Sequence, residues 1–106
     1  MVIVKDREII DGNMNLNITQ LTIFTYKHCN HCNSLKKRLD IEDIKYFDFD
    51  VEINRDSWLE IVKETGIDIV PTIYIKEENK DVGTFYLPGR DYHLEDEIFN
   101  IIKTYL

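Results

Sequence analysis

The sequence of 106 residues lacks the features that mark membrane and exported proteins. It has no run of 18 or more apolar residues, so we expect no membrane span. Charged residues appear early at its start and no long apolar region follows, which argues against a secretory signal. A cytoplasmic location is therefore expected, and the reducing conditions there disfavour a purely structural disulfide.

Positive charge is scarce. Thirteen Lys and Arg residues stand against 20 Asp and Glu residues, the net charge is −7, and no basic patch is visible. We therefore expect neither nucleic acid nor an anionic membrane as a partner. Internal repeats and low-complexity linkers are also missing, which predicts one compact domain that can fold around its own core and act as a monomer.

Only two cysteines are present, in the segment Cys29-Asn30-His31-Cys32. Positions i and i+3 on a helix lie roughly 5 Å apart at Cα, within the window that a disulfide needs. In a reducing compartment an isolated CxxC is more often catalytic or metal-binding than structural. Because such a pair can close and reopen with little backbone movement, we interpret it as a centre of thiol–disulfide exchange.

Hydrophobic patterns from residue 21 onward predict alternating strands and helices. The predicted elements are a strand at 21–25, a helix that starts at the cysteines, a strand at 46–51, a helix from Ser57 to Gly66, a hairpin of strands 72–75 and 82–86, and a final helix from Leu94. The order βαβαββα predicts an α/β fold with a four-stranded sheet, part parallel and part antiparallel, flanked by three helices.

The apolar faces of these elements follow from residue spacing. In the first helix Cys32, Leu35 and Leu39 are predicted to face inward, and Lys36, Lys37 and Arg38 to face water. Phe47, Phe49 and Val51 are predicted to share one face of the second strand. Ser57 and Glu60 have the spacing of a capping box, and Gly66 is a natural helix end. The last helix is predicted to bury Leu94, Ile98, Ile101, Ile102 and Tyr105.

Residues 1–20 allow two interpretations. Asp11-Gly12 is a strong tight-turn dipeptide, and polar and apolar residues alternate after it. The segment is either a β-hairpin that pairs about residues 2–10 with 13–18, or a loosely held extension. The domain proper is predicted at residues 21–106.

The two thiols are predicted to have different roles. Cys29 lies at the helix start, where backbone N–H groups and the helix dipole favour a thiolate, and Lys27, His28 and His31 add positive charge. Cys29 is therefore the expected nucleophile and Cys32 the resolving thiol. Each unit by which the Cys29 pKa falls favours its thiolate by about 1.4 kcal/mol. The same energy makes the couple more oxidising by about 30 mV.

Other interpretations of the cysteine segment stay open. The two cysteines could be inert helix residues. With His28 and His31 they supply four zinc ligands in type, but five consecutive residues can hardly surround a tetrahedral ion. The remaining histidine, His93, is expected to be an exposed residue near a helix cap, so we assign no metal ligand.

Val70-Pro71 precedes the third predicted strand. A proline at the first strand residue lacks the N–H of the ladder. If the Val70–Pro71 bond is cis, Val70 can present its backbone to an extended substrate. The sequence by itself favours an ordinary trans proline.

Together these segments resemble the glutaredoxin family within the thioredoxin fold. The shared features are the order of elements, the CxxC before the first helix, the segment 47–51, Thr65-Gly66 followed by Val70-Pro71, and the segment 88–91 before the last helix. The resemblance implies a dithiol oxidoreductase that reduces protein or glutathione-mixed disulfides. It implies glutathione as the reducing co-substrate, no bound cofactor, and disulfide-containing client proteins, of which ribonucleotide reductase is typical of the family.

The resemblance also implies a substrate site. Pro71 would be cis and packed against the disulfide, and Val70 would pair with the glutathione backbone. Gly89, Arg90 and Asp91 would hold the γ-glutamyl end. The basic residue that the family has three positions before the first cysteine aligns with Tyr26, and Lys27, which we also assign to the substrate site, comes one residue later.

The chain departs from the family pattern between its cysteines. Glutaredoxins usually carry Cys-Pro-Tyr-Cys, whereas Asn30 and His31 stand here. A histidine before the second cysteine is more typical of protein disulfide isomerases and bacterial disulfide oxidants. An oxidase or isomerase role that rests on His31 is therefore a second hypothesis, and a non-enzymatic metal or iron–sulfur binding module is a third.

Overall fold

The computed structural model describes residues 18–106, so the predictions for residues 1–17, including the hairpin, lie outside the described part. In chain order the elements are β2 (Ile18–Thr25), α1 (Asn30–Ile41), β3 (Phe47–Asp50), α2 (Arg55–Thr65), β4 (Thr72–Glu77), β5 (Thr84–Tyr86) and α3 (Glu95–Lys103). The strands form one sheet in the order β3-β2-β4-β5. β3 is parallel to β2, and β4 is antiparallel to both β2 and β5. The predicted order of elements and the mixed sheet are confirmed.

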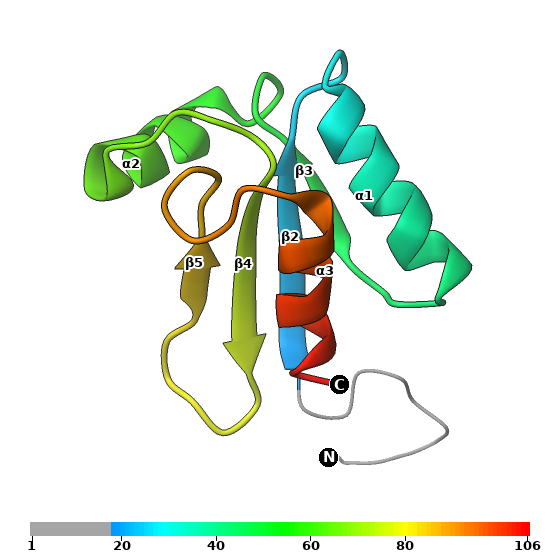
Figure 1. Cartoon of the computed structure of the whole chain (residues 1–106). Coiled ribbons are helices and arrows are strands. Elements are labelled where there is room, and N and C mark those ends of the chain that lie inside the picture. The colour runs from blue at the N-terminus through cyan, green and yellow to red at the C-terminus, as the bar shows by residue number, and fades with distance from the viewer. Residues whose placement is uncertain (1–17) are drawn as a thin grey trace.

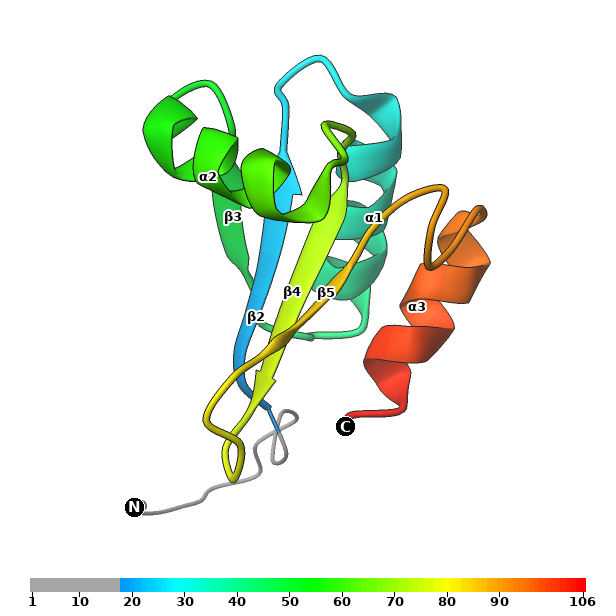
Figure 2. The ribbon, with the colours of Figure 1, turned by 90° about the vertical axis from the view of Figure 1, so that its left-hand side faces the viewer.

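Helices cover both faces of the sheet. α1 and α3 lie on one face and α2 lies on the other (Figure 1; Figure 2). Because side chains alternate along a strand, β2 directs Leu21 and Ile23 toward α1 and α3, and Phe24 toward α2. β2 begins at Ile18 rather than Leu21, so the predicted boundary between residues 20 and 21 falls within this strand.

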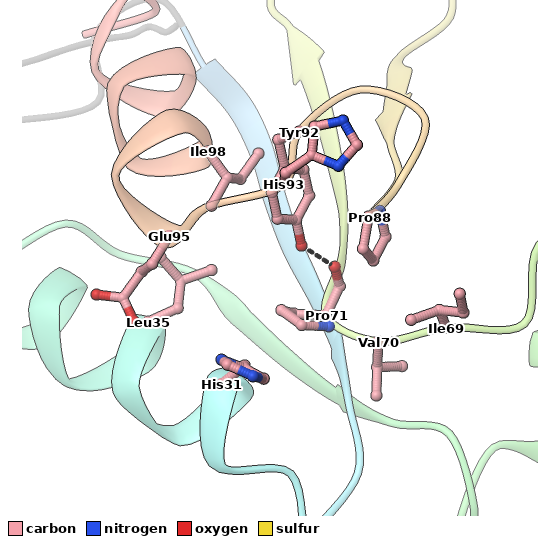
Figure 3. A pocket seen from close by; sticks show the side chains of 10 residues that line it. All are labelled: His31, Leu35, Ile69, Val70, Pro71, Pro88, Tyr92, His93, Glu95 and Ile98. Carbon is pink, nitrogen blue, oxygen red and sulfur yellow. Dashed lines mark hydrogen bonds between the residues drawn. The ribbon is translucent and has the colours of Figure 1, made fainter.

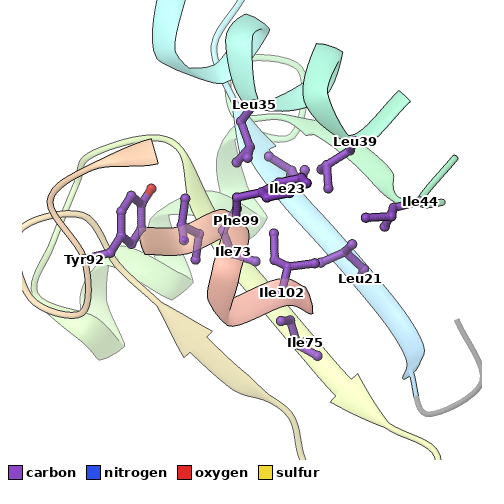
Figure 4. Packing of buried hydrophobic residues seen from close by; sticks show 11 residues of the cluster. Leu21, Ile23, Leu35, Leu39, Ile44, Ile73, Ile75, Tyr92, Phe99 and Ile102 are labelled. Carbon is purple, nitrogen blue, oxygen red and sulfur yellow. The ribbon is translucent and has the colours of Figure 1, made fainter. Parts of the chain in front are cut away.

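Each face has its own hydrophobic core. The core under α1 and α3 is mostly aliphatic (Figure 4). Its buried residues are Leu21, Ile23, Leu35, Leu39, Ile44, Ile73, Ile75, Tyr92, Ile98, Phe99 and Ile102. The core under α2 is smaller, with Phe24, Val51 and Trp58 as its buried residues. Full burial of one large apolar side chain contributes about 1.5–3 kcal/mol, so the first face supplies most of the hydrophobic stabilisation.

α1 carries the predicted apolar stripe, since its buried residues are Cys32, Leu35 and Leu39. Of the three basic residues predicted to face water, only Lys37 is exposed. The prediction is wrong for Lys36 and Arg38, which are half-buried and form ion pairs with β3 and α3, respectively. Long basic side chains at the rim of an apolar stripe bury their stems while their charged ends find partners.

α2 begins earlier than predicted. Its N-cap is Asn54, so the capping box predicted at Ser57 is wrong. The Asp50 carboxylate accepts hydrogen bonds from two backbone N–H groups in the turn before the helix, at 2.8 and 3.1 Å. This turn lets the chain enter the helix before Ser57. The end is as predicted, because Gly66 adopts the left-handed conformation with φ 77°.

Two further local predictions differ from the structure, and a third residue is more exposed than its neighbours. Phe47, predicted to share a face with Phe49 and Val51, is 64% exposed, because β3 is an edge strand. The second strand of the hairpin begins at Thr84 rather than at residue 82. Leu94 is the N-cap of α3 and is 64% exposed, so it does not belong to the apolar stripe of that helix.

Candidate functional site

The cysteine pair lies where the chain passes from β2 into α1. Cys29 is the N-cap residue of α1, and Cys32 lies one turn inside the helix. The two sulfurs form a disulfide, with the Cα atoms 5.2 Å apart. The backbone N–H of Cys32 donates a hydrogen bond to Cys29 Sγ at 3.1 Å. The predicted placement of the pair at the helix start is confirmed.

The two sulfur-bearing residues differ in access to solvent. Cys32 is 0% exposed, whereas Cys29 is half-buried. The N–H that points at Cys29 Sγ would equally stabilise a thiolate there, and the helix dipole acts in the same direction. Solvent access and electrostatics both favour Cys29 as the sulfur that attacks a substrate disulfide. Cys32 is then left to attack the mixed disulfide that Cys29 forms.

The loop before the pair is short and fixed by the backbone. The N–H of Cys29 donates to the carbonyl of Tyr26 at 3.0 Å. The Tyr26 ring contacts the His28 ring edge-on, with centroids 5.5 Å apart. Lys27, His28 and His31 are all exposed, in the loop before the pair and in the first turn of α1.

The Val70–Pro71 peptide bond is cis, as the resemblance implied. Pro71 is buried and Val70 is half-buried. Two side chains hold this segment in place. Thr72 Oγ1 donates to the Ile69 carbonyl at 2.8 Å, and the buried Tyr92 hydroxyl donates to the Pro71 carbonyl (Figure 3). Burial raises the pKa of Tyr92, so its phenol stays protonated and remains a donor.

A cavity of about 160 Å³ opens beside this segment. Its walls come from α1, the Val70–Pro71 segment and the start of α3 (Figure 3). The lining residues are His31, Leu35, Ile69, Val70, Pro71, Pro88, Tyr92, His93, Glu95 and Ile98. The cavity therefore brings together three of the predicted site residues, His31, Val70 and Pro71. Most of its wall is apolar, and its polar side chains lie on α1 and around the start of α3.

The remaining predicted substrate residues are placed elsewhere. Lys27, Gly89, Arg90 and Asp91 do not line the cavity. Gly89 has φ 85°, a conformation that favours glycine, in the loop between β5 and α3.

Arg90 and Asp91 bind each other in that loop. The Arg90 guanidinium lies 2.8 Å from the Asp91 carboxylate and also donates to the Phe85 carbonyl at 3.0 Å. The Leu87 N–H donates to Asp91 at 2.8 Å. Partial burial raises the pKa of Asp91, but the hydrogen bonds from Arg90 and Leu87 outweigh this, and the pKa lies below its usual value. Asp91 thus organises the loop and orients Arg90.

Glu97 caps the start of α3. Its carboxylate accepts hydrogen bonds from the backbone N–H groups of His93 and Leu94 at 2.7 and 3.0 Å. These bonds lower the pKa of Glu97. His93 is exposed and lies just before the helix cap, as predicted.

Among the described residues there is neither a metal-ligand cluster nor a membrane-spanning helix. Within residues 18–106, no group of three or more His, Cys, Asp or Glu side chains is placed to hold a metal ion. Among the helices of the same residues, none has the length and apolar character needed to cross a membrane. What the geometry does provide is a half-buried Cys29 beside a buried Cys32, a pair that in its reduced form can pass two electrons to a partner disulfide.

Comparison with known proteins places this geometry in a family. The sequence model of the glutaredoxin family matches residues 21–79, which include both cysteines and the cis proline. The chain belongs to the glutaredoxin family. Its sheet order and its helices on both faces are those of the thioredoxin fold expected for a glutaredoxin. The family and the cysteine pair together identify a thiol–disulfide oxidoreductase site.

Two further comparisons accompany this match. The crystal structure of thioredoxin from Trypanosoma brucei brucei is similar at 21% sequence identity, with a TM-score of 0.47. The similarity covers 85% of this chain and 80% of that chain. No curated protein sequence matches the chain.

Several residues of the site escaped the sequence analysis. Tyr92 was not singled out, yet its hydroxyl bridges to Pro71 across 21 positions of the chain. Glu95 lines the cavity although it belongs to the polar start of α3. Glu97 lacks a Ser or Thr partner three residues earlier, so the usual capping-box signal is missing. The first two depend on tertiary packing, for which local sequence holds no signal.

Proposed function

We propose that this glutaredoxin reduces protein disulfides and glutathione-mixed disulfides through Cys29 and Cys32. The observation that carries the proposal is the asymmetry of the pair: Cys29 is accessible at the helix N-terminus, and Cys32 is fully buried one turn away. An accessible nucleophile beside a protected second sulfur suits a two-step exchange, because the buried thiol meets only the mixed disulfide formed next to it.

The proposed cycle has two exchange steps. The Cys29 thiolate attacks one sulfur of the substrate disulfide; a Cys29–substrate bond forms, and the other sulfur leaves as a thiolate. Cys32 then attacks Cys29 Sγ, which forms the Cys29–Cys32 disulfide and releases the second substrate thiolate. The substrate gains two electrons and the protein loses two. Two molecules of glutathione would return the protein to the dithiol and leave as glutathione disulfide.

We further propose glutathione as the reductant, in the cytoplasm. Family membership supports this, since glutaredoxins generally use glutathione. Val70 lies at the cavity with its backbone beside the cis bond, where an extended thiol peptide can pair with it. Arg90, oriented by Asp91, supplies a half-exposed guanidinium for a carboxylate of the tripeptide. We propose that Lys27 contributes a second cationic group beside Cys29.

The decisive experiment is a redox titration of the Cys29–Cys32 pair in glutathione buffers, read by mass spectrometry. Cys29→Ser is expected to abolish reduction of both substrate classes. Cys32→Ser is the matched control: it should accumulate glutathionylated Cys29 and keep activity toward glutathione-mixed disulfides, but lose activity toward protein disulfides. Normal disulfide reductase activity in Cys29→Ser would refute the assignment of the nucleophile.

A second candidate, oxidation or isomerisation of disulfides, is favoured by the position of His31. His31 is exposed, precedes Cys32 and lines the cavity. A cationic imidazole there would stabilise the reduced, thiolate form and raise the reduction potential. This candidate predicts a potential well above that of thioredoxin, whose value is about −270 mV, and a fall in His31→Tyr. A potential near the thioredoxin value in the unmodified protein would exclude it.

A further inference from the structure

A charged cluster joins α1, β2 and β3 on the side of the sheet that α1 covers. Lys36 Nζ on α1 donates to Asp48 Oδ2 on β3 at 2.8 Å. Thr25 Oγ1, at the end of β2, donates to Asp48 Oδ1 at 2.6 Å. Thr25 is buried, and the Lys36 side chain is only 22% exposed. The cluster is therefore held by short hydrogen bonds, with Lys36 partly shielded from water and the Asp48 side chain 44% exposed.

The cluster lies on the same side of the sheet as Cys32. Lys36 follows Cys32 by one helical turn, and side chains four positions apart on a helix are neighbours, roughly 5–6 Å apart at Cβ. Asp48 is the strand partner of Ile23, and Ile23 belongs to the core under α1 and α3. Paired residues on neighbouring strands point to the same face, so Asp48 also faces α1. One cation thus lies one helical turn beyond Cys32, and the anion that pairs with it lies on the sheet face beneath α1.

The resolving step makes a demand on Cys32 that this cluster can meet. Only a thiolate attacks a disulfide, and burial disfavours the charged form of a thiol. Cys32 is 0% exposed, so water can do little to stabilise its thiolate. A neighbouring ammonium group favours ionisation, and a neighbouring carboxylate opposes it. Partial burial raises the pKa of Asp48, but the hydrogen bonds from Lys36 and Thr25 prevail and lower it, so the carboxylate is charged at neutral pH.

We propose that Lys36 and Asp48 are positioning residues that set how readily Cys32 ionises, and through this the rate of the resolving step. The proposal rests on the dithiol function proposed above. Lys36 stabilises the Cys32 thiolate, while Asp48 holds the ammonium group in place and reduces its net effect. In the step itself, the Cys32 proton passes to solvent and a bond forms between the two protein sulfurs. The bond from Cys29 to the substrate breaks, and the substrate leaves as a thiolate.

The other titratable groups near this end of α1 are the same in every variant of the proposed test. They are Lys27, His28 and His31, which are exposed before and within the first turn, and His93 and Glu95 across the cavity. Glu95 is already paired with Arg38 at 3.1 Å. Tyr46 is a further titratable group near the cluster. Burial, with smaller contributions from Asp40 and Asp48, raises the pKa of Tyr46 to about 12, so it remains a neutral phenol near neutral pH.

The test separates the two sulfur reactions with 5,5′-dithiobis(2-nitrobenzoate) in stopped flow. The reduced protein releases one thionitrobenzoate when Cys29 attacks, at a rate that grows with reagent concentration. It releases the second thionitrobenzoate when Cys32 resolves the mixed disulfide, and the rate of this release is independent of reagent concentration. The rate of the second release against pH reports the ionisation of Cys32.

Opposite effects are expected from the two partners. Because removal of a nearby cation raises a thiol pKa, Lys36→Met should slow the second release at pH 7 by about three- to tenfold, and Lys36→Arg should restore it. Asp48→Asn removes the negative charge, keeps one carbonyl oxygen that can accept from Lys36, and turns an amide N–H toward the Thr25 hydroxyl, which can accept it. It should therefore accelerate the second release by about twofold or more. Lys37→Met, on the exposed face of the same helix, is the matched control and should leave both releases unchanged.

Two results would overturn the proposal. Slower release in Asp48→Asn would overturn the proposal, because it would make the carboxylate a proton acceptor or a structural brace. Equal rates in Lys36→Met and wild type would overturn it as well. If Lys36→Met lost the native circular dichroism spectrum, Lys36→Gln would replace it under the same criteria. Failure of the dithiol function itself would look different, since the wild-type protein would then show no concentration-independent release.

Discussion

The two faces of the sheet carry different kinds of packing and different duties. The face under α1 and α3 is mainly aliphatic, and it holds the buried sulfur of Cys32, the cavity and the Lys36–Asp48 pair. The face under α2 is aromatic at its centre, where Phe24 lies between Trp58 and Phe49 at centroid distances of 5.6 and 4.9 Å. The chemistry is therefore concentrated on the face that also supplies most of the core.

The two faces nevertheless meet at the segment around the cis proline. On the α2 side, Trp58 Nε1 donates to Asp68 at 2.9 Å, just before Val70. On the α1 and α3 side, the Tyr92 hydroxyl donates to the Pro71 carbonyl. Residues 68–71, of which 69–71 line the cavity, therefore receive side-chain hydrogen bonds from both faces. Even the face that lacks the cysteines thus helps to hold the loop beside the cavity.

The largest expected effect is a loss of unfolding free energy, and it tests whether the core under α1 and α3 stabilises the fold more than the core under α2. Leu39→Ala on α1 removes a fully buried side chain and should lower the unfolding free energy by about 2–5 kcal/mol. Val62→Ala on α2 removes a half-buried side chain from the smaller core and should cost about 1 kcal/mol. Urea unfolding followed by the fluorescence of Trp58 measures both. Equal losses would show that the two faces contribute equally.

The next effect breaks the tether on the α2 side. Trp58→Phe removes the donor to Asp68 and part of a buried ring, and should cost about 1–3 kcal/mol in circular dichroism melts. Because the cysteine pair does not lie on this face, the second, concentration-independent thionitrobenzoate release should stay unchanged. Asp68→Asn keeps an acceptor for the indole N–H and serves as the milder control. A change in the resolving rate of Trp58→Phe would contradict the division of duties between the faces.

The tether on the other side should act on substrate binding. Tyr92→Phe removes the hydrogen bond to the Pro71 carbonyl. Loss of about 1 kcal/mol of positioning energy should raise KM for a protein disulfide about fivefold, with little change in kcat. Steady-state reduction kinetics measure this split. Tyr86→Phe is the matched control. The Tyr86 hydroxyl shares a hydrogen bond with Tyr105, and neither residue lines the cavity, so KM should stay unchanged.

The smallest effect concerns pH. The pKa of Asp91 is lower in the folded protein than its usual value, because the hydrogen bonds from Arg90 and Leu87 outweigh partial burial. Such a carboxyl stabilises the fold above its unfolded pKa, and the contribution is lost as pH falls through the folded pKa. Melting temperatures should therefore drop below about pH 4, and less steeply in Asp91→Asn. Asp81→Asn, in the exposed β4–β5 turn, should retain the wild-type slope.

Sequence analysis predicted those parts of the molecule whose causes are local. The spacing of Cys32, Leu35 and Leu39 defines the buried stripe of α1, and Gly66 ends α2, because helix periodicity and a left-handed cap act within a few residues. The cis Val70–Pro71 bond followed from family resemblance, whereas the residues themselves favoured a trans bond. Mechanistic roles of the predicted site residues remain predictions.

What escaped prediction depends on partners distant in the chain or on unusual caps. Asp48 is bonded from Thr25 on β2 and Lys36 on α1, so its environment exists only once the sheet has formed. Phe47 has the pattern of a core residue, but its strand lies at the sheet edge, which pattern alone does not reveal. α2 starts before Ser57 because the Asp50 carboxylate organises the preceding turn.

The unequal exposure of the two sulfurs has a practical consequence for labelling. Because Cys32 is fully buried and Cys29 is not, an alkylating reagent in limited amount should react with the reduced protein at a single, known atom. The chain has no third cysteine to compete for the reagent. A dye or affinity tag could therefore be attached to Cys29 of the natural sequence, without an engineered cysteine.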